Sequence, residues 1–263
     1  MHYFLGNHLN IVRFAPLIFL ASILIFLGIG WLYGKYRLRT SEKVIVRDSL
    51  ATAIFGLSAL VLGFTFSSSN DHFDARVSLM RAQADAIYQV YQSSKYLNSS
   101  DQIAVQNSLK EILQSRLSVF ENVDSFKALN ENLDGITTKL NKLNELIVLS
   151  ISRAPASSKE LADKILRPQQ DRLMDVFKAG ILNVKHHPPA ILERFLFTLL
   201  SIGSLLSGYA MAVQKEEDWF LTSIYLALMG LALYVIFALE FPNQLFTYES
   251  INSELLRIQK LIH

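Results

Sequence analysis

Four long stretches without a charged side chain set the pattern of this chain. Residues 14–34, 49–70, 195–214 and 219–239 contain no Asp, Glu, Lys or Arg. About 20 residues of α-helix, at 1.5 Å per residue, cross the roughly 30 Å hydrocarbon core of a bilayer. Core helices of a large soluble protein are the alternative, but such helices are shorter and carry a polar stripe. We therefore predict an all-α membrane protein with four spans, at about 14–34, 49–69, 194–214 and 219–239.

The region between the second and third spans is polar and helical in its periodicity. Residues 70–189 carry 15 Lys plus Arg and 14 Asp plus Glu, so their charge is balanced. Apolar residues recur at steps of three, four and seven, which is typical of one apolar helix face. Ser100 or Asp101 is expected to cap the helix that follows Asn98, and Pro168 to break or kink a later one. The predicted organisation is a transmembrane hairpin, a helical extramembrane domain, and a second transmembrane hairpin with a C-terminal helix, at 1–69, 70–189 and 190–263.

The second span runs into this polar region without a helix breaker. The stretch LVLGFTFSSSNDHFDAR (60–76) turns from apolar to polar within one turn, yet it has no proline and no glycine after Gly63. The apolar period continues through Val77 and Tyr91. We therefore predict one helix from about Asp48 to Leu97, long enough to extend about 40 Å beyond the bilayer.

Basic residues near the span ends bear on the orientation in the membrane. The linker 35–48 holds Lys35, Arg37, Arg39, Lys43 and Arg47, whereas the tail before Phe14 has only Arg13. Lys and Arg in short loops favour the cytoplasmic side. This places the linker in the cytoplasm and the helical domain outside.

A motif in the second helix resembles a known family. In GFTFSSSNDHFDARVSLMRAQADAI (63–87), the positions that fit are Gly63, Phe64, Thr65, Ser67, Phe73, Asp74, Ala75, Arg76, Ala84, Ala86 and Ile87. Gln83 and Asp85 stand where the family has Glu and Asn. The chain is similar here to bestrophin-like bacterial membrane proteins of unknown function. Their closing Asp-Leu-Asp-Arg-Pro motif reads Ala-Leu-Glu-Phe-Pro in this sequence, at 238–242, without the first Asp and the Arg.

The resemblance implies a four-span fold akin to that of bestrophins, pentameric ion channels whose second helix lines the pore. It also implies a bacterial inner membrane location. Bestrophins keep their large helical region in the cytosol, which is opposite to the orientation that the basic residues favour. Both orientations therefore stay open.

One face of the second helix consists of small and polar residues. Small residues let membrane helices approach closely, so tight helix contact explains this face equally well. The alternative is a pore surrounded by copies of the face, with Phe64 and Phe66 as an apolar constriction and Asp74 continuing the line. An acidic line through Asp71 and Asp85 favours cations, whereas Arg76 and Arg81 at the axis would favour anions. The face comprises Thr52, Gly56, Ala59, Gly63, Ser67, Asn70 and Asp71.

Composition excludes several classes of function. The chain has no cysteine, hence no disulfide, thiolate metal site or thiol catalysis. Walker, G-x-S-x-G, H-E-x-x-H and Gly-rich dinucleotide motifs are absent, so no enzyme and no cofactor is predicted. Basic residues are dispersed, which argues against nucleic acid as a partner. His186 and His187 are interpreted as a linker and not as a metal pair.

Two functions fit these observations. The first is a homo-oligomeric ion channel in a ring of five with a cation preference, whose partners are the lipid bilayer, other copies of the chain and inorganic ions. The second is a non-conducting membrane sensor or scaffold whose helical domain binds a protein. Its basis is the repetitive Asn/Leu/Lys helix at 127–150, which looks like a partner or self-association surface.

Overall fold

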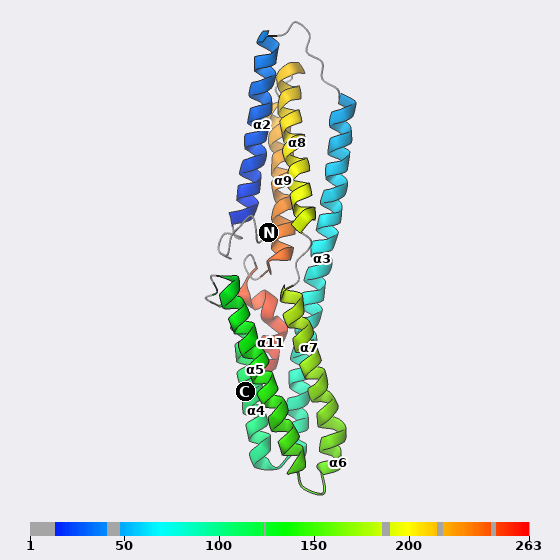
Figure 1. Cartoon of the computed structure of the whole chain (residues 1–263), viewed down its shortest axis with the longest axis vertical. Helices are drawn as coiled ribbons and strands as arrows, with labels where there is room; N and C mark the ends of the chain where they lie inside the picture. Colours follow the sequence, from blue (N-terminus) through cyan, green and yellow to red (C-terminus); the bar gives the residue numbers. More distant parts are fainter. Residues whose placement is uncertain are drawn as a thin grey trace. The chain divides into compact units, whose positions relative to one another are not determined.

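The structure is a computed structural model that describes residues 14–40, 48–121, 123, 125–185, 190–214, 218–242 and 246–262. These residues form helices and no β-strand, as the sequence predicts (Figure 1). Four helices are long and apolar enough to cross a membrane, within Ala15–Thr40, Thr52–Tyr96, Arg194–Gln214 and Trp219–Glu240. The chain divides into two compact units, one holding the spans and one holding the polar helices.

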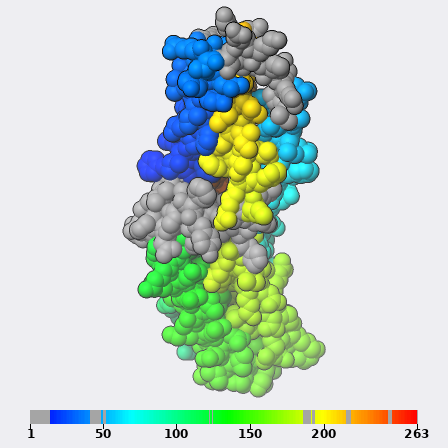
Figure 2. Space-filling view, turned by 45° about the horizontal axis from the view of Figure 1, so that its top comes forward, coloured from blue at the N-terminus to red at the C-terminus, as the bar shows by residue number. Residues whose placement is uncertain are grey.

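Glycines bring two spans of the membrane unit into close contact. Helix α2 (Ala15–Thr40) lies along α8 (Ala190–Gln214) (Figures 1 and 2). Helix α9 (Trp219–Glu240) also contacts α2 (Figure 1). A Cβ on Gly208 would lie 2.9 Å from the carbonyl carbon of Leu27, and one on Gly30 would lie 2.8 Å from that of Leu205. Small residues such as these glycines allow the backbones of two membrane helices to come into contact.

Helix α3 (Asp48–Ser93) is one continuous helix of 46 residues. Its first part belongs to the membrane unit and its second part, from Phe73, to the helical unit. A short 3₁₀ turn, η2 (Ser94–Tyr96), follows it and Leu97 leaves the helical conformation. The predicted single helix from Asp48 to about Leu97 is therefore confirmed.

The helical unit is a bundle around a leucine- and isoleucine-rich core. Four helices join α3 there: α4 (Ser99–Leu117), α5 (Phe126–Ser152), α7 (Arg167–Lys185) and α11 (Tyr248–Ile262). The apolar stripe of α5 is buried in this core, including Leu133, Leu140 and Ile147. The expectation that this stripe is a partner surface is therefore wrong, because the unit itself covers it.

The C-terminal helix corrects the expected division of the chain. The sequence analysis places it with the last two spans, in 190–263. In the structure, Leu255, Ile258 and Ile262 of α11 are buried in the core of the helical unit. An amphipathic helix is stable where its apolar face is covered, and here the polar helices cover it.

A π-helical segment precedes Pro168, where the sequence predicts a break or kink. The short α6 (Lys159–Leu161) leads into the π-helical segment η3 (Ala162–Leu166), and α7 begins one residue before the proline. A π-turn inserts a residue and rotates the face that follows. Ala162 and Leu166, at the two ends of this segment, are buried, whereas Leu161 just before it is 45% exposed.

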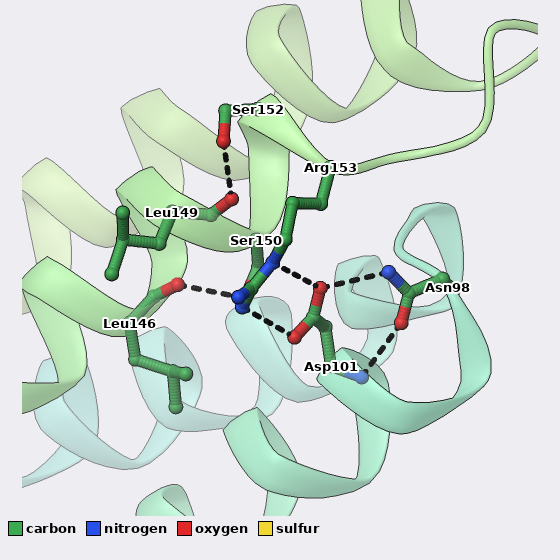
Figure 3. Close-up of polar contacts among 7 residues, drawn as sticks. All are labelled: Asn98, Asp101, Leu146, Leu149, Ser150, Ser152 and Arg153. Carbon is green, nitrogen blue, oxygen red and sulfur yellow. Dashed lines mark hydrogen bonds and ion pairs between the residues drawn. The ribbon is translucent and has the colours of Figure 1, made fainter.

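An ionic contact joins the start of α4 to the end of α5 (Figure 3). Asn98, not Ser100 or Asp101, caps α4: its Oδ1 accepts a 2.8 Å hydrogen bond from the Asp101 amide. The Asp101 carboxylate accepts two hydrogen bonds from the Arg153 guanidinium, at 2.7 Å from Nη2 and 3.2 Å from Nε. Two parallel bonds of this kind fix geometry as well as charge.

Replacing Arg153 by methionine should lower the unfolding free energy of the helical unit by about 1 kcal/mol. Asp101 is mostly buried, so it loses two charge-assisted hydrogen bonds with little solvent to replace them, although Arg153 itself is half exposed. Thermal unfolding followed by circular dichroism measures the change. Lys164→Met is the control, because its ion pair with Glu160 is exposed on both sides. Equal midpoints for the two variants would contradict the expectation.

Candidate pore-lining face of the second span

The membrane part of α3 has a buried face and an exposed face. Ser58, Val61, Thr65 and Ser69 are buried against the rest of the membrane unit. The hydroxyl of Ser58 donates to the Ile54 carbonyl at 2.8 Å, and that of Thr65 to the Val61 carbonyl at 2.8 Å. The hydroxyls of Ser58 and Thr65 are thus satisfied inside the helix, where no water is needed.

The predicted small-polar stripe lies on the opposite, exposed side of α3. Successive residues of an α-helix are rotated by about 100°, and this rotation places the stripe on the side of α3 opposite Thr65. Asn70 is half-buried and the other members of the stripe are exposed, namely Thr52, Gly56, Ala59, Gly63, Ser67, Asp71 and Asp74.

Two glycines of the stripe have open space beside them, unlike the glycines of α8 and α9. No atom of another described helix lies within 4 Å of a Cβ placed on Gly56 or Gly63. By contrast, a Cβ on Gly203 of α8 would lie 3.3 Å from the Phe55 ring, on a different side of α3. Close contact among the chain's own described spans therefore does not explain why glycine occurs at positions 56 and 63.

The two phenylalanines of the predicted constriction do not share one direction. Phe64 is 61% exposed and Phe66 is 46% exposed. Measured around the helix from Gly63, Phe64 lies about 100° to one side and Phe66 about 60° to the other. The two side chains of one helix therefore point in different directions, and Phe66 is the nearer of the two to the centre of the stripe.

Charged residues farther along α3 have partners within the helical unit. Asp85 lies 3.9 Å from Arg257 of α11, and Arg81 lies 3.8 Å from Glu254 of the same helix. Arg257 and Glu254 are themselves joined at 3.0 Å. These four side chains balance one another, so Asp71 and Asp74 are the acidic members of the predicted line that this network does not include.

Two features of the structure were not predicted from the sequence. One is the pair of glycines Gly30 and Gly34, a G-x-x-x-G spacing whose signal was available in the first span and which contacts α8. The other is Gln83, which was seen only as a departure from a motif and which lies in the core of the helical unit. His186, His187 and the neighbouring prolines lie outside the described residues. Within the described ranges, no group of three or more His, Asp or Glu could hold a metal ion.

Comparison with known proteins gives a fold. No family model matches the chain, and no curated protein matches its sequence. A variant of a bacterial bestrophin homologue from Klebsiella pneumoniae has a TM-score of 0.69 at 13% identity, covering 92% of this chain and 96% of that chain. Another variant of a homologue from the same organism has a TM-score of 0.63 at 13% identity, covering 94% and 98%. A crystal structure named only as a membrane protein has 0.63 at 14% identity, covering 93% and 98%.

These likenesses extend over nearly the whole length of both chains, although the sequences share little. Together with the four apolar helices, they confirm the predicted architecture and the predicted resemblance at the level of the fold. The chain is a multi-pass membrane protein with the bestrophin-like fold.

Proposed function

We propose that the protein is a homo-oligomeric ion channel in which the stripe of α3 lines the ion path. The observation that carries this proposal is the open face of α3. Gly56, Gly63 and Ser67 have no described span of their own chain over them, while the opposite face of the same helix is buried. Copies of the chain arranged in a ring would turn this face toward a shared axis.

A ring explains the composition of the stripe better than lipid contact does. Lipid-facing positions of the other spans carry large apolar side chains, such as Leu17 on α2 and Leu228 on α9, each 62% exposed. The stripe has Gly, Ala, Thr and Ser instead. Small and hydroxyl-bearing residues leave room for water and offer hydrogen bonds to it, which suits a path for hydrated ions.

Within this proposal Phe66 narrows the path and Asp71 selects the ion. Phe66 is the nearer phenylalanine to the stripe, and an apolar ring at that level gates by dewetting. Asp71 lies four residues beyond Ser67 and is exposed. A ring of carboxylates at this level attracts cations. Five copies is the number that the resemblance to bestrophins implies.

Replacing Asp71 by lysine should shift the ion preference of purified protein in liposomes from cations toward anions, by roughly tenfold in the permeability ratio. The measurement is the reversal potential, or paired flux of a cation and an anion. Asp163→Lys is the matched control, since it makes the same charge change at an exposed position on the helical unit.

Two results would count against the proposal in different ways. Liposomes that pass no ions over a range of voltage, pH and salt would reject conduction itself. Conduction with an unchanged permeability ratio in Asp71→Lys would reject the placement of Asp71 beside the path.

The scaffold alternative loses its main support. It relied on the apolar stripe of the helix at 127–150, and that stripe is largely covered inside the helical unit. A monomer or dimer in mild detergent would restore this alternative, because a closed ring of copies would then be absent.

A further inference from the structure

Among the residues that the structure describes, a buried arginine of the helical unit has no charged partner. Arg116 lies in the last turn of α4 and is only 9% exposed. Its Nε donates a 3.0 Å hydrogen bond to Oε1 of Gln83. Its Nη1 is buried and has no hydrogen-bond acceptor in the described part of the chain. The acceptor that the described residues offer this guanidinium is one neutral amide oxygen, that of Gln83.

The amide of Gln83 is held in one orientation. Gln83 comes from α3 and is 2% exposed. Its Nε2 donates to the Val176 carbonyl of α7 at 3.3 Å, so Oε1 is left to face Arg116. Gly180 makes this arrangement feasible, because a Cβ there would collide with the Gln83 amide nitrogen. Three helices meet at a polar contact that carries no negative charge.

The positive charge of Arg116 persists in this environment. Burial lowers the pKa of Arg116 to about 10, which still leaves the guanidinium protonated at neutral pH. No carboxylate of the described residues forms an ion pair with it. A buried charge without a counter-charge is strongly unfavourable, so folded proteins pair or coordinate such groups.

We propose that Arg116 binds a small monovalent inorganic anion, such as chloride or bromide, inside the helical unit. The anion accepts a hydrogen bond from Nη1 and neutralises the guanidinium. One positive charge calls for one negative charge. The surrounding apolar core favours a halide over a multiply charged, strongly hydrated anion such as phosphate or sulfate.

Such a site stabilises the contact of three helices. Gln83 bonds to Arg116 of α4 and to the Val176 carbonyl of α7, so an anion that fixes the guanidinium also fixes α3 in the bundle. The inference is independent of ion conduction, since the site lies in the helical unit and needs no pore.

Thermal unfolding of the full chain in mild detergent tests the site. Midpoints are compared in sodium chloride, sodium bromide and sodium gluconate at equal ionic strength, because gluconate is a much larger anion than either halide. We expect the halides to raise the midpoint by about 2–4 °C over gluconate. Bromide also permits a direct test, with an anomalous scattering peak expected beside Arg116 Nη1 in a crystal.

Two variants separate site binding from a general salt effect. Gln83→Glu places a carboxylate beside the guanidinium, so this variant should lose the difference between halide and gluconate. Arg167→Met removes an exposed arginine that pairs with Asp163 at 2.9 Å, and it should keep the full difference. Equal midpoints for the unmodified chain in all three salts would overturn the proposal, as would an undiminished halide effect in Gln83→Glu.

Discussion

Gly208→Ala should lower the thermal midpoint of the membrane unit strongly, whereas Gly63→Ala should leave it unchanged or raise it. At Gly208 an added methyl would meet the backbone of α2. It would lie 2.9 Å from both the Leu27 carbonyl carbon and the Trp31 backbone nitrogen. Backbone atoms of a helix cannot rotate aside as a side chain can, so α2 and α8 must move apart. Overpacking of this kind costs about 1–3 kcal/mol.

Gly63→Ala is the matched comparison, because it makes the same chemical change on a membrane helix with open space around it. No atom of another described helix lies within 4 Å of the added methyl. Alanine also favours the helix over glycine by about 1 kcal/mol. Circular dichroism and size-exclusion melting in mild detergent measure both variants. A Gly208→Ala midpoint equal to that of the unmodified chain would contradict the described α2–α8 contact.

The spans and the long helix could be predicted from the sequence because their signals are local. A charge-free run of about 20 residues identifies a span wherever it lies. The continuity of α3 follows from the uninterrupted period between Asp48 and Ser93, with no breaker after Gly63. Only its end was displaced, since the turn at Ser94–Tyr96 is 3₁₀ and the chain extends at Leu97.

The placement of α11 could not be predicted in the same way. Its pattern shows that one face is apolar, but it does not show which other helices cover that face. Leu255 and Ile258 are buried among residues that are more than 100 positions earlier in the chain, such as Leu113. The same limit applies to α5, whose Leu140 and Leu143 are typical of both a core helix and a partner surface.

The candidate site was predicted in its residues but not in its rotation. The stripe from Thr52 to Asp71 is visible as a periodic pattern, yet periodicity does not tell whether a face is covered. The structure supplies that information for the chain's own described helices through the open space at Gly56 and Gly63. The η3 segment shows another limit, because a π-turn changes which residues face the core and leaves no signal in the apolar pattern.

Water beside the stripe is the second result that we expect to be large. The chain has no cysteine of its own, so single cysteines can be introduced without background. Gly63→Cys and Ser67→Cys change exposed positions. A thiol reacts with a charged methanethiosulfonate reagent only as the thiolate in water, because lipid keeps the thiol protonated and excludes the reagent. Modification at either position would add a fixed positive charge to every copy in the ring and reduce cation flux by roughly tenfold or more.

Cysteines at three positions outside the stripe serve as controls for the reactivity of the stripe positions. Thr65→Cys and Ser69→Cys lie on the buried face of the same helix. Leu228→Cys lies on α9, where the side chain is 62% exposed on a strongly apolar span. None of the three should react, the first two because the chain's own helices cover them and the third because lipid does.

The reaction rate of Ser67→Cys with a membrane-impermeant cationic thiol reagent, in the full chain reconstituted in liposomes, tests the central claim most directly. The account predicts fast modification together with loss of ion flux, while Leu228→Cys stays unmodified. Equal, negligible rates at Ser67→Cys and Leu228→Cys would show that the stripe is dry, and that result would contradict an ion path along α3.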